Sequence, residues 1–147
     1  MTSGFLLDTN VLSELMRSQP AEPVLAWFAA NTQSAMFTST INQAEILAGI
    51  ALLPAGQRRT ALASAAEQLF DVDFDGRCPG FDAAASRNCA FIVAARTRQG
   101  RPISTEDAQI AAIALAAGLT LLTRNIRDFE GIDGLALANP WLAGAAQ

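Results

Sequence analysis

Acidic side chains are the residues of this sequence whose types and spacing are best suited to chemistry. Asp8 and Asp128 each come after an apolar run typical of a buried strand, and Glu45 and Asp107 each lie in the expected first turn of a helix. Carboxylates are hard oxygen ligands that suit Mg²⁺ and Mn²⁺. Because clustered carboxylates raise one another's pKa, such a cluster normally needs a cation to be stable. The pattern therefore predicts a divalent-metal site if folding brings these positions together.

A metal site of this kind is suited to the cleavage of phosphodiesters. The cation would position a water for in-line attack, lower the pKa of that water and neutralise the charge that grows on the phosphate. Each acid also has an ordinary structural interpretation. An aspartate before a helix is commonly an N-cap, and an acid in the first turn complements the helix dipole. The combination of these residues, rather than any one of them, favours a functional site.

Residue types that are missing from the sequence exclude several mechanisms. The chain contains no histidine, no lysine and no tyrosine. A catalytic triad, a P-loop, Schiff-base chemistry and most zinc hydrolases need histidine or lysine. Phosphotransfer receivers and haloacid-type phosphatases also normally use a lysine. An enzyme of this composition depends on carboxylates, hydroxyls, arginines and metal.

The composition indicates a packed globular protein. A chain of 147 residues with 51% hydrophobic and 16% charged residues fits one domain over residues 1–147. We expect a cytoplasmic protein without membrane contact, because no signal peptide is visible and the apolar region 108–122 is interrupted and short.

All ten basic residues are arginines, and the net charge is -4. This charge argues against binding nucleic acid by bulk electrostatics alone, although local patches are compatible with it. Arg124 and Arg127 are candidate RNA contacts, since arginine suits bidentate contacts to phosphate. Clusters such as Arg96 with Arg98 are interpreted by default as a solvated helix face or a helix end.

Hydrophobic periodicity and breakers indicate strands that alternate with helices, with no internal repeat. We expect strands at 5–7, 36–41, 119–123 and 135–137, with 69–81 irregular or extended. We expect helices at 11–16, 23–28, 42–53 (capped by Asn42), 57–69, 82–99 and 104–117 (capped by Ser104 and stopped at Gly118), of which 42–53 and 57–69 form a helical hairpin. This order predicts an α/β fold of three α/β/α layers on a mainly parallel central sheet. Ligand sites of such sheets collect beyond the carboxyl ends of the strands. Asp8 and the Asn125/Asp128 pair follow two of those ends.

Three segments carry the acids: FLLDTNVLSEL contains Asp8, STINQAEILAGI contains Glu45, and ISTEDAQIAAIALAAGLTLLTRNIRDF contains Asp107. Together they resemble PIN-domain toxins of the VapC and FitB type, and the resemblance covers nearly the whole chain. The ending LALANPW is also similar to a common terminus of that family. The resemblance implies a PIN-like domain in which these three acids are catalytic and bind the metal.

The sequence departs from this family at one site position. The family often has an aspartate where this chain has Asn125, in TRNIRDF. Asp128 is then the candidate fourth catalytic and metal-binding carboxylate, while Asn125 is placed to hydrogen-bond a metal-bound water or the phosphate. Thr9, Asn10 and Thr123 are the other candidate supporting polar residues.

The resemblance also implies an activity and partners. It implies an endoribonuclease that depends on Mg²⁺ or Mn²⁺, forms a homodimer and is the toxin of a type II toxin–antitoxin pair. A small antitoxin of the VapB or FitA kind, encoded alongside, would inhibit it and would provide the contact to operator DNA. Apolar helix residues such as Trp27 and Leu47 are interpreted either as the antitoxin groove or as core. The RNA target and the number of metal ions are left open.

Two alternatives are kept beside this interpretation. Acids at 71, 73, 75 and 82 with Gly76 match part of a calcium-binding EF-hand loop, but Pro79 and an aspartate in place of the final glutamate argue against it. The other alternative is a catalytically silent PIN-like binding module that acts in an antitoxin and DNA repressor complex. Retention of the three acids argues against that loss of activity.

Overall fold

A four-stranded parallel sheet forms the centre of the protein, in the order β2-β1-β3-β4. The computed structural model describes residues 4–142. The strands are β1 (Gly4–Leu7), β2 (Ala35–Phe37), β3 (Thr120–Leu122) and β4 (Leu137–Ala138). The helices are α1 (Thr9–Leu15), α2 (Glu22–Ala30), α3 (Thr40–Ala51), α4 (Gln57–Glu67), α5 (Ala83–Arg98), α6 (Thr105–Ala117) and α7 (Ile126–Phe129), with a π-helical turn η1 (Gln68–Asp73) and a 3-10 turn η2 (Pro140–Leu142).

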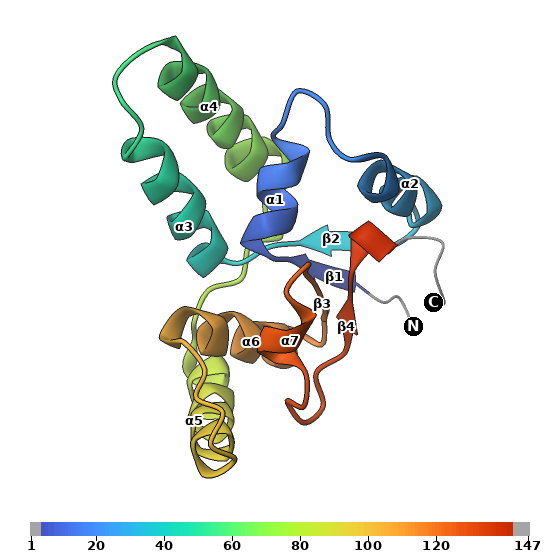
Figure 1. The fold of residues 1–147 in the computed structure, drawn as a ribbon, viewed down its shortest axis with the longest axis vertical. Coiled ribbons are helices and arrows are strands. Elements are labelled where there is room, and N and C mark those ends of the chain that lie inside the picture. The colour runs from blue at the N-terminus through green and yellow to red at the C-terminus, as the bar shows by residue number, and fades with distance from the viewer. Residues whose placement is uncertain (1–3, 143–147) are drawn as a thin grey trace.

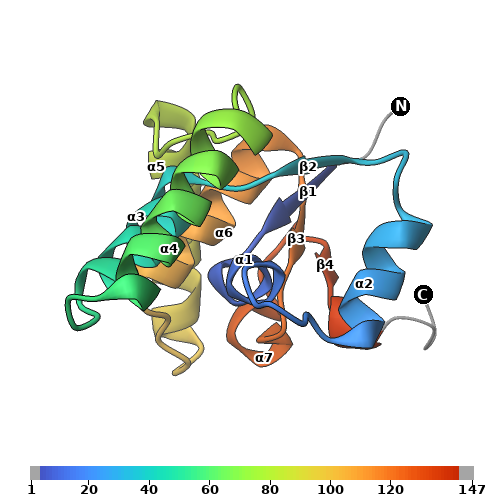
Figure 2. The same ribbon diagram turned by 90° about the horizontal axis from the view of Figure 1, so that it is seen from above.

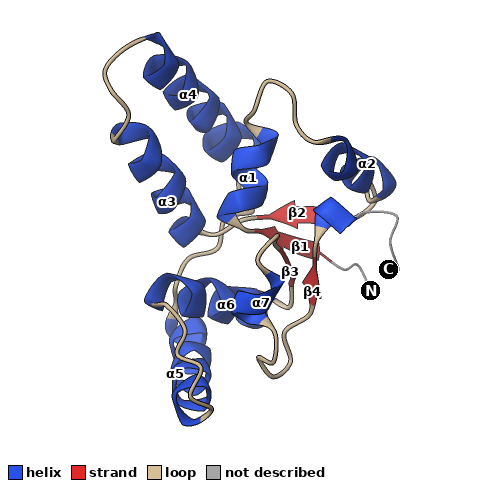
Figure 3. Ribbon diagram, viewed as in Figure 1, coloured by secondary structure: helices blue, strands red, loops and turns tan. Residues whose placement is uncertain are grey.

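Helices cover both faces of this sheet, so the domain has three layers (Figure 1 and Figure 3). Successive strand residues point to opposite faces. Leu6 and Leu121 pack with α5, α6 and α7, whereas Leu7 and Leu122 pack with α1, α2 and α3. The predicted α/β/α architecture with a parallel sheet is therefore confirmed.

The order of the strands places a topological switch point beside β1. The chain passes from β1 to β2 on one side and returns, through α3 to α6, to β3 on the other side. Leu7 of β1 pairs with Leu122 of β3, and the Asp8 backbone N–H donates to the Leu122 carbonyl at 2.9 Å. The first residues after both strands are thus neighbours, which is where ligand sites of such sheets form.

The start of α3 differs from the sequence prediction. The predicted strand 36–41 is wrong in its second half, because β2 ends at Phe37 and α3 already begins at Thr40. Ser39, rather than Asn42, is the N-cap, and its side chain accepts from the Asn42 backbone N–H. Glu45 consequently lies in the second turn of the helix instead of the first. A serine that caps an orphan N–H outweighed the strand preference of the residues around it.

The segment expected to be irregular or extended at 69–81 is also partly helical. The turn η1 continues directly from α4, and it buries Phe70, while Phe74 at its end is buried too. Residues four apart in a helix lie on one face, so a helical turn brings both rings to the core beside Ala66. Asp82 is the N-cap of α5. The EF-hand arrangement is therefore not formed.

The helices α3 and α4 pack as the expected helical hairpin, which Figure 2 shows from above beside α5 and α6. On the opposite side of that view, α2 lies beside the C-terminal turn η2 and contacts it. Trp27 of α2 belongs to the core, whereas Leu47 of α3 and Leu52, which follows the end of α3, are exposed. Within residues 4–142, no helix is long and apolar enough to span a membrane.

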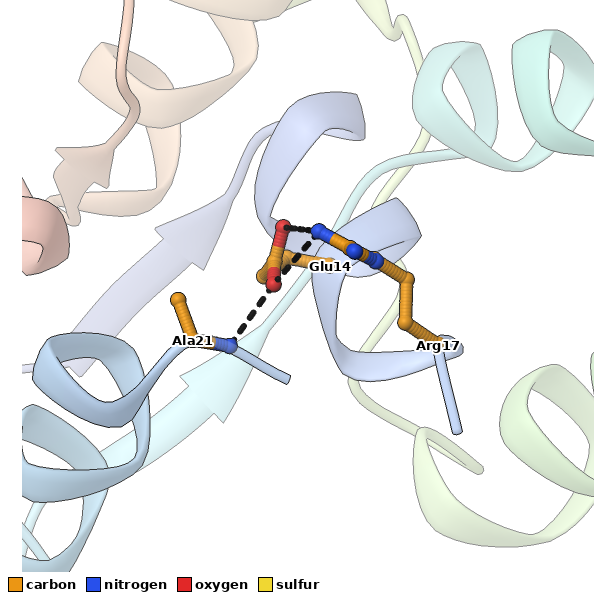
Figure 4. Close-up of polar contacts among 3 residues, drawn as sticks. All are labelled: Glu14, Arg17 and Ala21. Carbon is orange, nitrogen blue, oxygen red and sulfur yellow. Dashed lines mark hydrogen bonds and ion pairs between the residues drawn. The ribbon is translucent and has the colours of Figure 1, made fainter. Parts of the chain in front are cut away.

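A buried glutamate joins α1 to the start of α2. Glu14 is only 6% exposed, and its carboxylate accepts from the Ala21 backbone N–H at 2.7 Å and from Arg17 (Figure 4). Ala21 is the N-cap of α2 and has no side-chain cap of its own. The Glu14 carboxylate of α1 therefore caps the N-terminus of α2, and it fixes the loop between the two helices.

We expect Glu14→Ala to lower the free energy of unfolding by about 1–3 kcal/mol, because the Ala21 N–H loses its charged acceptor at a helix end. Arg17→Ala should cost about 0–1 kcal/mol, since the arginine side chain is 66% exposed and water screens its ion pair. Urea unfolding of both variants beside the wild type measures the difference. Equal losses in the two variants would contradict the capping role.

Candidate active site

Asp8 is the centre of a buried polar network at the carboxyl end of β1. Its Oδ1 accepts from the Thr9 backbone N–H at 2.9 Å and from Asn42 Nδ2 at 3.1 Å. Its Oδ2 accepts from Thr123 Oγ1 at 2.8 Å and from Asn10 Nδ2 at 3.4 Å. Burial raises the pKa of Asp8, and these four hydrogen bonds oppose that rise by favouring the carboxylate. The residue is both the N-cap of α1 and a candidate ligand.

Glu45 is connected to this network through Thr9. The Thr9 hydroxyl donates to Glu45 Oε1 and accepts from Asn42 Nδ2 at 3.0 Å. Ser39 Oγ in turn donates to Asn42 Oδ1. Sequence reasoning missed Ser39 and treated Asn42 only as a cap. The one signal was a pair of polar residues three apart at the start of a helix that also carries a candidate ligand.

Asp107 faces the other carboxylates from the start of α6. Ser104 is the N-cap, as predicted, and accepts from the Asp107 backbone N–H at 3.1 Å. Burial raises the pKa of Asp107 to about 6, and the negative charge of Asp8 is the next cause. Asp128 and Glu45 raise this pKa further, against a lowering by Ser104. The four predicted acids therefore share one electrostatic environment.

Removing the charge of Asp107 should stabilise the metal-free protein near neutral pH. Because folding raises this pKa from 3.8 to about 6, Asp107 favours the folded state only while it is protonated, and that contribution is lost as the pH rises from about 4 through 6. Asp107→Asn should gain about 1 kcal/mol over wild type at pH 8 and much less at pH 4, a value reduced because water screens the half-buried side chain. Thermal unfolding in EDTA at both pH values measures this gain, and an equal effect at both would contradict it.

The loop after β3 holds the remaining polar candidates. Thr123 Oγ1 accepts from the Asn125 backbone N–H at 3.0 Å and from Asn10 Nδ2 at 3.3 Å. Asn10 Oδ1 accepts from the Arg124 backbone N–H at 3.1 Å, so Asn10 ties α1 to this loop. The Arg124 guanidinium stacks over the Trp141 ring, 4.7 Å from its centroid. Arg124 is thus held beside the acids, with its side chain exposed.

Arg96 of α5 fixes the backbone that carries Asp128. Its Nη2 donates to the Asp128 and Glu130 carbonyls at 2.8 and 3.2 Å, and its Nη1 donates to the Arg101 carbonyl at 3.4 Å. Arg96 is only 4% exposed, so a solvated helix face is wrong for this residue, whereas its place in the last turn of α5 agrees with a helix end. Asp128 itself lies in α7 and is exposed, as are Asn125 and Arg127.

The carboxylates fit a divalent cation in chemistry, because Mg²⁺ and Mn²⁺ prefer oxygen ligands. Among the described residues, no group of three Asp, Glu or Cys side chains is close enough together to hold an ion as it stands. Charge repulsion acts over longer distances than a metal–oxygen bond of about 2.0–2.6 Å, so this agrees with the raised pKa of Asp107. Asp8, Glu45, Asp107 and Asp128 are the residues that would hold the ion, and ligation requires small movements of their side chains.

A cleft of about 920 Å³ opens beside this site between α1, α3 and α4. Thr9 and Glu45 line its end nearest the acids, and apolar Ile46, Ile50 and Leu62 line it farther away. Exposed arginines also line it, namely Arg17, Arg58 and Arg124. The cleft therefore joins an apolar surface to the acidic site.

These features define an α/β/α protein with a carboxylate-rich site at the switch point of a parallel sheet. The chain belongs to the PIN-domain family, whose model matches residues 5–135. It is 42% identical to the plasmid stability protein StbB of Pseudomonas syringae pv. tomato over 94% of this chain and 99% of that protein. It is 40% identical to the VapC ribonuclease Y4jK of Sinorhizobium fredii, over 92% of this chain and 96% of that protein. It is 38% identical to the toxin FitB of Neisseria gonorrhoeae, over 92% of this chain and 97% of that protein.

Solved structures agree with this assignment. The fold matches a chain of FitAB bound to a DNA fragment with a TM-score of 0.85 and 36% identity, covering 93% of this chain and 95% of that chain. It matches a chain of DNA-bound VapBC from Salmonella typhimurium with a TM-score of 0.76 and 27% identity, covering 95% and 99%. The predicted resemblance to VapC and FitB toxins is confirmed.

Proposed function

We propose that the protein is an endoribonuclease that depends on Mg²⁺ or Mn²⁺ and serves as the toxin of a toxin–antitoxin pair. The observation that carries this proposal is the set of carboxylates that share one environment at the switch point, where burial first, and then the negative charge of Asp8, raises the pKa of Asp107 to about 6. The relatives named as a ribonuclease and as a toxin support the substrate class and the biological role.

The cleavage chemistry divides between the cation and the chain. A bound cation supplies an activated water and neutralises charge on the phosphate. Four hydrogen bonds orient the Asp8 carboxylate and favour its ionised form against the burial that raises its pKa. Arg124, stacked on Trp141 at the edge of the acidic site, is placed to bind a phosphate of the RNA, and Arg127 in α7 provides a second exposed cation nearby.

The antitoxin is proposed to dock in the cleft between α1, α3 and α4. The apolar part, with Ile46 and Ile50, suits an amphipathic segment, and the exposed Arg58 suits acidic residues on that segment. Because Thr9 and Glu45 line the same cleft, a segment seated there would also cover the acidic site. The neighbouring FitAB and VapBC structures contain DNA, and we propose that operator DNA is contacted through the antitoxin, in line with the net charge of -4 of this chain.

A homodimer is part of the same proposal. Several large apolar side chains in α5 and at the end of α3 are exposed, with Phe91 of α5 at 77% and Leu52, directly after α3, at 85%. A second copy of the chain that covered them would remove this apolar surface from water. The molar mass in solution, measured by light scattering, tests this part.

The direct test of the enzyme is incubation of purified, antitoxin-free protein with structured RNA in Mg²⁺, Mn²⁺ or EDTA. We expect cleavage with either metal and none in EDTA. A folded protein that binds metal but leaves total RNA intact would contradict the nuclease. That result would favour the silent binding module instead, which the DNA-bound neighbours make the second candidate.

A further inference from the structure

Asn42 is a fully buried amide whose polar atoms all face the candidate site or its own helix cap. Its exposed fraction is 0%. Its Nδ2 donates to Asp8 Oδ1 at 3.1 Å and to Thr9 Oγ1 at 3.0 Å, and its Oδ1 accepts from Ser39 Oγ. An amide that is buried and fully hydrogen-bonded has a fixed position, so it holds each of its hydrogen-bond partners in a fixed position too.

The hydrogen-bond network also fixes the direction in which this amide points. The Asn42 backbone N–H donates to Ser39 Oγ at 3.2 Å, which leaves the serine proton free to be donated to Asn42 Oδ1. A reversed amide would place its carbonyl oxygen against the Asp8 carboxylate, where two acceptors repel. Ser39 therefore orients the amide so that both N–H groups point toward the site.

The same amide orients the Glu45 side chain through the Thr9 hydroxyl. Because Thr9 Oγ1 accepts from Asn42 Nδ2, its own proton is directed to Glu45 Oε1. Glu45 is an exposed residue with a flexible side chain. Within residues 4–142, this bond is the one hydrogen bond that the Glu45 side chain makes. Asn10, the other amide at Asp8, makes a longer bond of 3.4 Å and is part of the link to the β3 loop.

We propose that Asn42 is a positioning residue that orients Asp8 directly and Glu45 through Thr9 for metal binding. The proposal rests on the function proposed above. Removal of the amide would take one buried donor from Asp8 and would remove the bond that directs the Thr9 proton to Glu45. Residues that hold ligands in this way typically change metal affinity or activity by about 10–100-fold when they are replaced.

The test compares Mn²⁺ binding by calorimetry to the wild type, Asn42→Ala and Thr9→Val, each shown to be folded by circular dichroism. We expect Asn42→Ala to bind Mn²⁺ about 10–100-fold more weakly. Thr9→Val removes the link to Glu45 but keeps the bond from Asn42 to Asp8, and it should show a smaller loss. The matched control is Asn88→Ala, since Asn88 donates to the Ala112 carbonyl at 3.3 Å outside the site. It should bind Mn²⁺ as the wild type does. Saturating Mn²⁺ should restore most of the RNA cleavage by Asn42→Ala, which a general packing defect would not allow.

Each outcome supports or overturns the proposal. A folded Asn42→Ala with Mn²⁺ affinity within twofold of wild type overturns the role of Asn42 alone. If Asn42→Ala does not fold, the isosteric Thr9→Val decides, and wild-type Mn²⁺ affinity in that variant overturns the link to Glu45. A wild type that neither binds Mn²⁺ nor cuts RNA overturns the proposed function itself, together with this role.

Discussion

Asp8→Asn should reduce RNA cleavage by roughly 10²–10³-fold, the range expected when one preorganised electrostatic group is lost from an active site. Asp8 is the most buried of the candidate acids and the one whose two oxygens are held by hydrogen bonds from both α1 and the β3 loop. Asparagine has the same shape, and its oxygen can still accept from Thr9 and Asn42. The Thr123 hydroxyl can turn to accept from the new amide in place of Asn10 Nδ2, whose bond of 3.3 Å it gives up. The variant should therefore fold and still lack the charge that a metal requires.

Cleavage rates at saturating Mn²⁺, measured beside a melting curve, test this expectation. The matched control is Asp71→Asn, which makes the same change at an exposed position of η1, away from the site. It should cut RNA at the wild-type rate, and it also tests the rival calcium loop, since Asp71 would be its first ligand. Full activity in Asp8→Asn would remove Asp8 from the mechanism and with it the proposed site.

The second large effect is on stability. Arg96→Met should lower the free energy of unfolding by about 3 kcal/mol, because methionine keeps the apolar stem but leaves three partly buried carbonyls without a charged donor. The arginine donates hydrogen bonds to the carbonyls of Asp128, Glu130 and Arg101. These bonds join α7 and the loop before α6 to α5. A loss of this size corresponds to a drop in melting temperature of roughly 6–12 °C for a domain of this length.

The control for this variant is Arg98→Met, two residues along the same helix, where the side chain is exposed. It should change the melting temperature by no more than about 1–2 °C, as surface substitutions usually do. Comparable losses in both variants would mean that the charge or the helix end, rather than the three carbonyl contacts, is responsible. Because Arg96 holds the Asp128 backbone, the folded fraction of Arg96→Met should also cut RNA more slowly.

The sequence by itself determined the features that depend on near neighbours along the chain. Ser104 caps α6, and Gly118 ends it with a left-handed φ of 68°, as the local pattern predicted. Asp82 caps α5. The alternation of apolar strands and helices predicted the parallel three-layer fold, and strand ends predicted the neighbourhood of Asp8 and Thr123. Such signals can be read from sequence because caps, breakers and periodicity act within a few residues.

The tertiary structure decided everything that depends on partners far apart in the chain. Asn42 became a buried donor to Asp8, 34 residues away, and Arg96 became a buried link to Asp128, 32 residues away. Neither role has a local pattern, because an amide or a guanidinium looks the same in sequence whether it meets water or a distant carbonyl. Only packing, which removes water and leaves each polar group needing a partner, makes that choice.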